Sequence, residues 1–166
     1  MARQLWVLRH AEAEPHGTRS DSERRLTARG ELQARTAGVA LARMEPGFEV
    51  VLYSPKARAR ATAALAAEAW SSEQRSLLHE HPPLASGFGA RDALDALAEI
   101  SADGRLLLVG HEPDLSGVIA DLTGGRIDLK KGGLAVVRLE GVGGELAVLL
   151  RPRELALVAG VPSDGH

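Results

Sequence analysis

The sequence predicts an α/β fold of three layers, α/β/α, with a mostly parallel central sheet and an antiparallel hairpin near the C-terminus. Short apolar runs alternate with segments of helical periodicity, and this alternation is typical of a parallel sheet covered by helices. The chain has 166 residues, of which 45% are hydrophobic, so it can bury one complete core. We therefore expect one domain over residues 1–160 and a loose tail at 161–166.

The first strand is expected at Leu5–Leu8, an apolar run of the kind found in strands that are buried on both faces. Residues 27–44 begin with a threonine suited to an N-cap and repeat their apolar side chains at helical spacing, which predicts a helix. A second strand follows at Glu49–Tyr53. Ser54-Pro55 is then expected to supply the N-cap and first residue of an alanine-rich helix, about 56–69, because the missing N–H of proline is not needed there.

The second half of the chain continues the alternation. A short strand is expected at Leu77–Glu80, and the prolines and glycines of 82–89 predict an irregular loop before the next helix. Two later apolar runs are separated by glycine-rich residues, which indicates an antiparallel hairpin. The remaining expected elements are, in order, a helix around Leu94–Ala98, a strand at Leu106–Val109, a helix opened by Pro113, the hairpin strands Leu134–Leu139 and Glu145–Leu150, and a last helix over Arg151–Gly160.

Charge and composition exclude several classes of partner and chemistry. A net charge of −2 and a pI near 6.3 provide no general attraction for nucleic acid or acidic membranes, so neither is an expected partner. The sequence contains no cysteine, which rules out disulfides, thiolate zinc sites and cysteine nucleophiles. No apolar run approaches the roughly 20 residues that span a membrane, and no signal peptide is visible, so we expect a cytoplasmic protein.

Three of the expected strands end in residues that can carry chemistry. In open parallel sheets, ligands bind in the crevice beyond the carboxyl ends of the strands, so residues far apart in sequence meet there. The residues at these ends are Arg9 and His10 after the first strand, Ser54 and Arg58 after the second, and His111 after the strand at Leu106–Val109. We expect them to form one site.

The residue types at these strand ends predict an anion-binding site that acts on phosphate. Two arginines and a histidine beside helix N-termini suit a compact oxyanion, and a phosphoryl group needs such surroundings through its transition state. A histidine within a cationic cluster has its charged form disfavoured, so His10 would be neutral near pH 7 and able to attack phosphorus. Because these cations supply the charge that Mg²⁺ supplies elsewhere, we expect no cofactor and no metal ion.

The same residues lie in motifs of a known family. Residues 8–13, Leu-Arg-His-Ala-Glu-Ala, resemble the Arg-His-Gly/Ala signature of the histidine phosphatase superfamily. Asp21 before Arg24, together with the short chain, is most similar to the SixA-like phosphohistidine phosphatase branch. The resemblance runs from about residue 5 to at least 122 and implies a phosphoglycerate-mutase-like fold. The downstream pieces follow in the order of the family: Arg24–Gly30, then Ser54-Pro55 with Arg58 and Thr62, then Gly110-His111.

The resemblance implies a role for each matching residue. His10 would become a phosphohistidine, and Arg9 and Arg58 would clamp the phosphoryl oxygens. His111 would complete that clamp. Arg24 would bind the phosphate from the loop after the first strand. The expected catalytic residues are therefore His10, Arg9, Arg58 and His111, with Arg24 as a substrate-binding residue.

A proton donor to the leaving group is the part of the pattern that is hardest to find in this sequence. Larger members of the superfamily carry a carboxylic acid in an insertion after the second helix, whereas the corresponding region here, 79–92, is short. Glu80 in that region, and Glu12 and Asp21 in the loop after the first strand, are the candidate proton donors. Two histidines flank Glu80, but no third metal ligand accompanies them, so an exposed loop is the better interpretation.

The leading hypothesis is a phosphohydrolase that forms a phosphohistidine on His10 and dephosphorylates phosphohistidine in a protein. A small-molecule phosphomonoesterase and a phosphoglycerate-mutase-like phosphotransferase are alternatives, and the short chain without an acid insertion argues against the mutase. A non-catalytic module that binds phosphorylated ligands is a further alternative, against which the complete set of reactive residues argues. The partner is then a phosphorylated protein or a small phosphorylated substrate, and the sequence does not indicate the oligomeric state.

Overall fold

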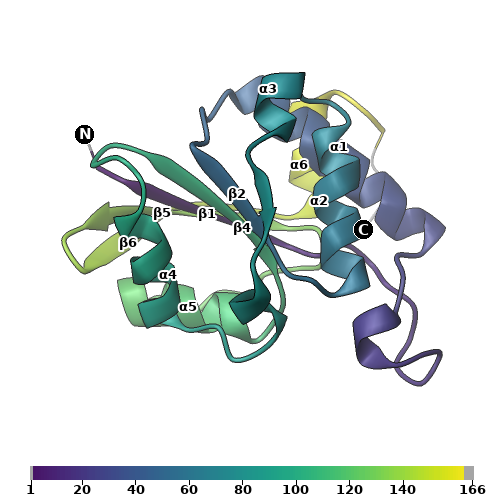
Figure 1. Cartoon of the computed structure of the whole chain (residues 1–166). Helices are drawn as coiled ribbons and strands as arrows, with labels where there is room; N and C mark the ends of the chain where they lie inside the picture. Colours follow the sequence, from purple (N-terminus) through teal and green to yellow (C-terminus); the bar gives the residue numbers. More distant parts are fainter. Residues whose placement is uncertain (1, 163–166) are drawn as a thin grey trace.

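Six strands pair into one sheet in the computed structural model, which describes residues 2–162 (Figure 1). The strands are β1 (Gln4–Arg9), β2 (Val50–Tyr53), β3 (Leu78–Glu80), β4 (Arg105–Gly110), β5 (Leu134–Glu140) and β6 (Gly143–Leu150). Their order across the sheet is β3-β2-β4-β1-β5-β6. The first four in this order run parallel, whereas β5 is antiparallel to both β1 and β6. The predicted mostly parallel sheet with a C-terminal antiparallel hairpin is therefore confirmed.

Helices cover both faces of the sheet. Two short 3-10 helices also lie in the loops, at Asp21–Glu23 and Pro82–Ala85. Helices α1, α2 and α6 pack on one face, and α4 and α5 pack on the other, which confirms the three predicted layers (Figure 1). The α-helices are α1 (Ala28–Met44), α2 (Ala57–Ala67), α3 (Ser72–Arg75), α4 (Ala90–Ala98), α5 (Asp114–Thr123) and α6 (Pro152–Ala159).

Alternate residues of β1 divide between two apolar clusters. Leu5 and Val7 are fully buried in the cluster that includes α4 and α5. Trp6 and Leu8 are buried in the cluster that includes α1, α2 and α6. Burial on both faces explains why the strand is apolar without interruption, and it holds the end of β1 firmly in the centre of the sheet.

Two features of the chain differ from the expectation. Helix α2 begins at Ala57 with Lys56 as its N-cap, so the predicted N-cap at Ser54 was wrong. The Ser54 hydroxyl instead accepts a hydrogen bond from the Lys56 N–H at 3.2 Å, and this local turn delays the start of the helix. Helix α3 was not predicted, although Ser71 and Gln74 close it with reciprocal capping hydrogen bonds.

The C-terminal helix agrees with the prediction. Arg151 is the N-cap of α6 and Gly160 is its C-cap, at the two ends of the expected range. The expected loose tail begins at the next residue, and its last part, 163–166, lies outside the described residues. Between residues 2 and 162, no helix combines the length and the apolar character that crossing a membrane requires.

Helices α1 and α2 approach each other closely where Gly38 faces Ala66. A Cβ atom at position 38 would overlap the backbone of Ala66. The Gly38 carbonyl also accepts a hydrogen bond at 3.0 Å from the indole N–H of Trp70, which lies just after α2. A glycine at this position therefore sets the distance between the two helices.

Replacing Gly38 by alanine is expected to lower the free energy of unfolding by about 1–3 kcal/mol, because overpacking outweighs a gain of about 1 kcal/mol in helix propensity. Gly117→Ala is the matched control, since a Cβ atom at Gly117 on α5 meets no atom within 4 Å. The control should gain up to about 1 kcal/mol. Urea denaturation of both variants measures the difference. A Gly38→Ala protein as stable as the wild type would contradict this close packing.

Candidate active site

The carboxyl ends of β2, β4 and β1 lie side by side, as the strand order requires. Arg9 pairs with Gly110 in the parallel ladder, and the His10 N–H extends the ladder by donating to the Gly110 carbonyl at 3.0 Å. On the other side of β4, the Ser54 N–H donates to the Val109 carbonyl at 3.0 Å. The structure thus brings the predicted residues together. A pocket of about 180 Å³, called the His10 pocket below, is lined among others by His10, Arg9, Arg58, His111 and Arg24.

His10 is buried, with 6% of its surface exposed, and its ring is held in one tautomer. Nδ1 lies 2.8 Å from the Ala11 carbonyl oxygen and must donate to it, because a carbonyl can only accept. The unprotonated Nε2 accepts from the Nε–H of Arg58 at 3.4 Å. Burial lowers the pKa of His10 to about 3, and the neighbouring cationic groups act in the same direction. His10 is therefore neutral near pH 7, with the Nε2 lone pair available as a nucleophile.

An aspartate holds the cationic side chains around His10 in place. Asp21 accepts from Arg58 through its backbone carbonyl at 2.6 Å and through its carboxylate at 3.3 Å. The same carboxylate accepts from Lys56 at 2.8 Å and from Arg24 at 2.9 Å. These hydrogen bonds, led by that of Lys56, hold the pKa of Asp21 well below its usual range. A carboxylate that stays ionised is a poor proton donor, which argues against that predicted role for Asp21.

His111 faces His10, with ring centroids 5.2 Å apart, and Ser54 orients it. The Ser54 hydroxyl lies 2.7 Å from Nε2 of His111 and also accepts the Lys56 N–H. The buried hydroxyl makes only these two hydrogen bonds within residues 2–162, so its own proton is satisfied when it is donated to Nε2, and His111 then carries its proton on Nδ1. Burial lowers the pKa of His111 to about 3, and Arg58 adds to this effect.

Three buried side-chain nitrogen atoms in residues 2–162 have no hydrogen-bond partner, and all three belong to residues that line the His10 pocket. They are Nε of Arg9, Nε of Arg24 and Nδ1 of His111. Other nitrogens of the two arginines are used, since Arg9 donates to the Leu129 carbonyl at 2.9 Å and Arg24 to the Glu14 carbonyl at 2.7 Å. Buried donors without acceptors are rare in folded proteins. An oxyanion bound in the pocket would satisfy them.

Two hydrogen-bonding groups fix the segment that follows β1. The Thr62 hydroxyl accepts from the Ala11 N–H at 3.1 Å and donates to the Arg58 carbonyl at 2.7 Å, which ties this segment to α2. The Gly132 N–H is shared between two consecutive carbonyls at the end of β1, at 3.1 and 3.0 Å. His10 and Arg9 are thereby held by α2 on one side and by the turn at Gly132 on the other.

None of the three predicted proton donors, Asp21, Glu12 and Glu80, is among the residues that line the His10 pocket. Glu12 accepts from the Thr27 hydroxyl at 2.7 Å, pairs with Arg29 at 3.5 Å and lines a neighbouring groove. Glu80 is exposed at the end of the edge strand β3 and is not among the pocket-lining residues. Across the described residues, no three His, Asp or Glu side chains are placed to hold a metal ion, and the two histidines that flank Glu80 are no exception.

Sequence reasoning missed two carboxylates that line the His10 pocket, Glu14 and Glu112. Glu14 pairs with Arg19 at 2.8 Å, and this hydrogen bond lowers the pKa of Glu14. Glu112 accepts from the Ser116 N–H at 2.9 Å and from the Ser116 hydroxyl. Both carboxylates are therefore held as hydrogen-bond acceptors. The position of Glu112 directly after a strand-end histidine was a usable signal, whereas nothing in the sequence singles out Glu14.

The sequence of this chain is similar to a known protein family and to a known protein. The family model described as histidine phosphatase superfamily (branch 1) matches residues 5–81. An uncharacterized protein from Picosynechococcus sp. (strain ATCC 27264 / PCC 7002 / PR-6) is 32% identical over 146 residues, which cover 81% of this chain and 84% of the relative.

Solved structures with the same fold cover nearly the whole chain. A protein assigned as the phosphohistidine phosphatase SixA from Nakamurella multipartitia is 27% identical, with a TM-score of 0.75 over 92% of this chain and 97% of that chain. The protein histidine phosphatase SixA complexed with tungstate is 24% identical, with a TM-score of 0.78 and coverage of 92% and 99%. A protein assigned as an α-ribazole-5′-P phosphatase from Escherichia coli K-12 is 23% identical, with a TM-score of 0.73 and coverage of 91% and 98%. These similarities confirm the predicted phosphoglycerate-mutase-like fold.

His10 and His111 are expected to stay neutral from about pH 4 to pH 8 in the folded protein, because burial lowers each pKa to about 3. NMR titration of the ring resonances, assigned with His10→Gln and His111→Gln variants, measures this. Phosphate-free buffer is required, since a bound anion favours the imidazolium form. Stability should fall as the pH drops below about 6.5, where the unfolded histidines bind protons that the folded ones do not. Either ring titrating near pH 6.5 would contradict this description.

Ser54→Ala is expected to weaken the binding of inorganic phosphate by about 3–10-fold, the effect of one hydrogen bond, because His111 loses the partner that fixes its tautomer. Long-range ¹⁵N–¹H spectra should show the Nδ1–H tautomer of His111 in the wild type and a mixture in the variant. His10 is the internal control, since its Nδ1–H bond to Ala11 is untouched by the substitution. An Nε2–H tautomer of His111 in the wild type would rule out this role for Ser54.

Proposed function

The chain belongs to the histidine phosphatase superfamily, and on that premise we propose a phosphohydrolase with His10 as nucleophile and phosphohistidine in a protein as substrate. Family membership supports phosphatase activity. One observation carries the proposal further: the unprotonated Nε2 of His10 shares a pocket with buried donors on Arg9, Arg24 and His111 that find no acceptor within residues 2–162. Such a pocket suits a phosphoryl group better than a neutral substrate.

In the proposed reaction, Nε2 of His10 attacks phosphorus, and the bond from phosphorus to the substrate imidazole breaks. The electron pair of that bond stays on the imidazole nitrogen, and because the other ring nitrogen of the substrate carries a proton, the ring leaves as neutral imidazole. Arg9, Arg58 and His111 hold the phosphoryl oxygens while their charge is redistributed. The Nδ1–H bond to the Ala11 carbonyl keeps the ring in position and stabilises the charge that it carries while phosphorylated. Water then attacks the same phosphorus, which releases inorganic phosphate and restores neutral His10.

The carboxylates near the His10 pocket favour a substrate with a good leaving group. Glu14, Glu112 and Asp21 each accept hydrogen bonds from the protein, so all three carboxylates are already engaged by donors other than a leaving group. An alkoxide leaving group gains about 10²–10⁴-fold from a general acid, whereas imidazole, with a pKa of about 6.5, departs with little help. This contrast supports phosphohistidine over an alkyl phosphate as the substrate.

A small-molecule phosphomonoesterase is the second candidate, and Glu112 is the observation that favours it. Its carboxyl group lines the His10 pocket directly after His111 and would serve as a proton donor if its contacts with Ser116 were released. Neither candidate needs a metal ion or cofactor, because arginines and histidines already surround the phosphoryl site with donors and positive charge. The sequence without cysteine fits the cytoplasmic location that we include in the proposal.

We expect kcat/KM for a phosphohistidine peptide to exceed that for the matching phosphoserine peptide by at least about 10²-fold, the lower end of the general-acid range. Both substrates are measured under one set of conditions in excess EDTA. With labelled phosphohistidine substrate, a rapid quench that avoids acid should show the label on the peptide that contains His10.

His10→Ala should remove both the label and the turnover, whereas Glu112→Gln should leave phosphohistidine turnover within about 3-fold of the wild type. Label on any residue other than His10 would refute the mechanism. Equal turnover of phosphoserine, lost in Glu112→Gln, would instead establish the second candidate with Glu112 as its acid.

A further inference from the structure

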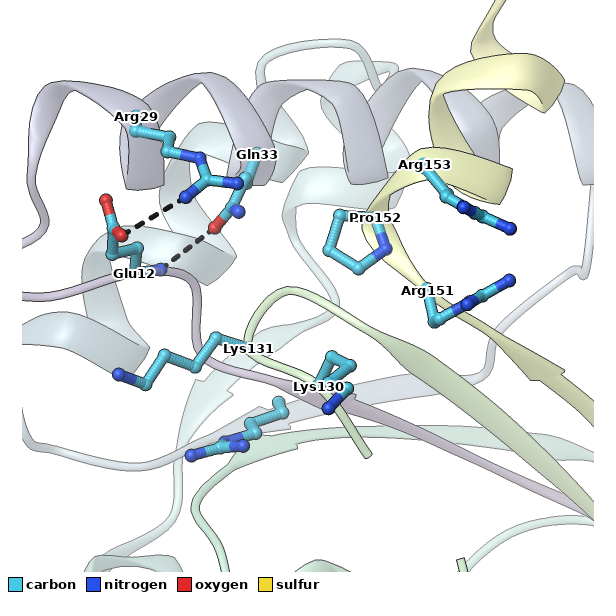
Figure 2. Close-up of a pocket in the computed structure, with 9 residues that line it drawn as sticks. Glu12, Arg29, Gln33, Lys130, Lys131, Arg151, Pro152 and Arg153 are labelled. Carbon is cyan, nitrogen blue, oxygen red and sulfur yellow. Dashed lines mark hydrogen bonds and ion pairs between the residues drawn. The ribbon is translucent and has the colours of Figure 1, made fainter. Parts of the chain in front are cut away.

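A strongly cationic groove of about 420 Å³ (Figure 2) shares two of its lining residues with the His10 pocket. Six cationic side chains and a single carboxylate, that of Glu12, are found among the residues that line it. Arg9 and Lys131 line both this groove and the His10 pocket, so the two adjoin. The lining residues of this basic groove are Arg9, Glu12, Arg29, Gln33, Lys130, Lys131, Arg151, Pro152 and Arg153.

The positive charge of the basic groove is only partly neutralised by the protein itself. Glu154 pairs with both Arg151 and Arg153, at 2.8 and 3.0 Å, so one carboxylate serves two guanidinium groups. Lys130 pairs with Asp128 at 2.7 Å. Lys131 is exposed and makes no ion pair with any residue of 2–162. Because the chain as a whole has a net charge of −2, these cations are concentrated on one surface rather than spread over the molecule.

The lysines of the basic groove are held at a fixed place relative to the nucleophile. Lys130–Gly133 is a turn closed by a hydrogen bond from the Gly133 N–H to the Lys130 carbonyl at 2.8 Å. Gly132 has a φ of +74°, which a side chain would strain, and its N–H binds the two carbonyls at the end of β1. The Arg9 N–H in turn donates to the Gly133 carbonyl at 3.1 Å. The turn and the end of β1 therefore move as one unit.

The arrangement of the cations indicates what kind of anion they fit. In Figure 2 the side chains of Arg151 and Arg153 extend away from Arg29 and end near each other, in keeping with their shared partner Glu154. The charges of the groove therefore lie in separate groups along it and do not all converge on one point. A compact polyanion would need converging donors. Single-stranded nucleic acid is usually held by aromatic side chains on which bases stack, and the lining of the basic groove contains none.

We propose that the basic groove binds an acidic polypeptide segment of the substrate protein, next to its phosphorylated residue. This inference rests on the proposed function, since it names the partner that the His10 pocket would act on. Arg9 and Lys131 bridge the two sites, so a segment lying in the groove reaches the phosphoryl site without leaving the protein surface. Complementary charge of this kind raises association rates and selects among partners.

The test compares a groove variant, Lys130→Gln/Arg151→Gln/Arg153→Gln, with a control that loses the same charge elsewhere. The control is Arg60→Gln/Arg91→Gln/Arg138→Gln, on exposed arginines of α2, α4 and β5. Fluorescence anisotropy measures binding of an unphosphorylated peptide of 12 residues with six Asp and Glu, and of the same peptide with Asn and Gln. The wild type should bind the acidic peptide at least about 10-fold more tightly than the neutral peptide, which is the combined effect of three exposed ion pairs. This preference should fade at high salt.

The groove variant should lose this preference while the control variant keeps it. A preference that survives in the groove variant, or equally tight binding of a single-stranded oligonucleotide of 12 bases to the wild type, would overturn the inference. A second measurement uses two phosphohistidine peptides, one with acidic residues and one with Asn and Gln beside the phosphohistidine. Phosphoramidate serves as a small substrate that reaches only the His10 pocket. The groove variant should lose about 10-fold in kcat/KM on the acidic peptide and less than about 2-fold on phosphoramidate.

The binding and turnover measurements fail independently. If the acidic peptide binds in the groove but phosphohistidine is not hydrolysed, the proposed function is wrong, and of the groove inference only the binding of an acidic segment stands. If phosphohistidine is hydrolysed but acidic residues beside it change neither binding nor turnover, the function stands and the groove inference is wrong.

Discussion

The parallel pairing of β1 with β4 is the interaction on which the site depends. It sets Arg9 opposite Gly110, so the residues that follow, His10 and His111, leave the sheet as neighbours. Strand β1 is also paired with β5 on its other side, and its residues are buried on both faces, so its end has no freedom to shift. The packing of Leu8 and its neighbours therefore helps to set the distance between the rings of His10 and His111.

Charge balance is the second constraint. Arginines and a lysine crowded around a neutral histidine would repel one another, and Asp21 on a 3-10 helix supplies the compensating negative charge. It engages both terminal nitrogens of Arg58 and leaves the Nε–H of that residue directed at His10. The arginine is thus oriented by the protein before any anion arrives, which reduces the reorganisation that binding requires.

The site could be predicted from the sequence as far as strand ends determine it, because apolar runs locate the strands and the residues after them meet at one edge. His10, Arg58 and His111 were found in this way. Ser54 was assigned to a helix cap because Ser-Pro commonly begins a helix, and only the fold shows its hydroxyl between Lys56 and His111. The basic groove could not be predicted, because its lysines and its α6 arginines each look like ordinary exposed charges. They meet because Leu134 pairs with Leu150 in the hairpin, and no sequence pattern sets that register.

The unpartnered nitrogens of Arg9, Arg24 and His111 also connect folding to occupancy. Buried donors that lack acceptors raise the free energy of the native state, so under the proposed function inorganic phosphate that satisfied them would stabilise the fold through simple mass action. Apolar replacements that filled this space would yield a more robust and inactive protein. Natural selection for turnover and natural selection for thermal endurance therefore act in opposite directions on the same few atoms.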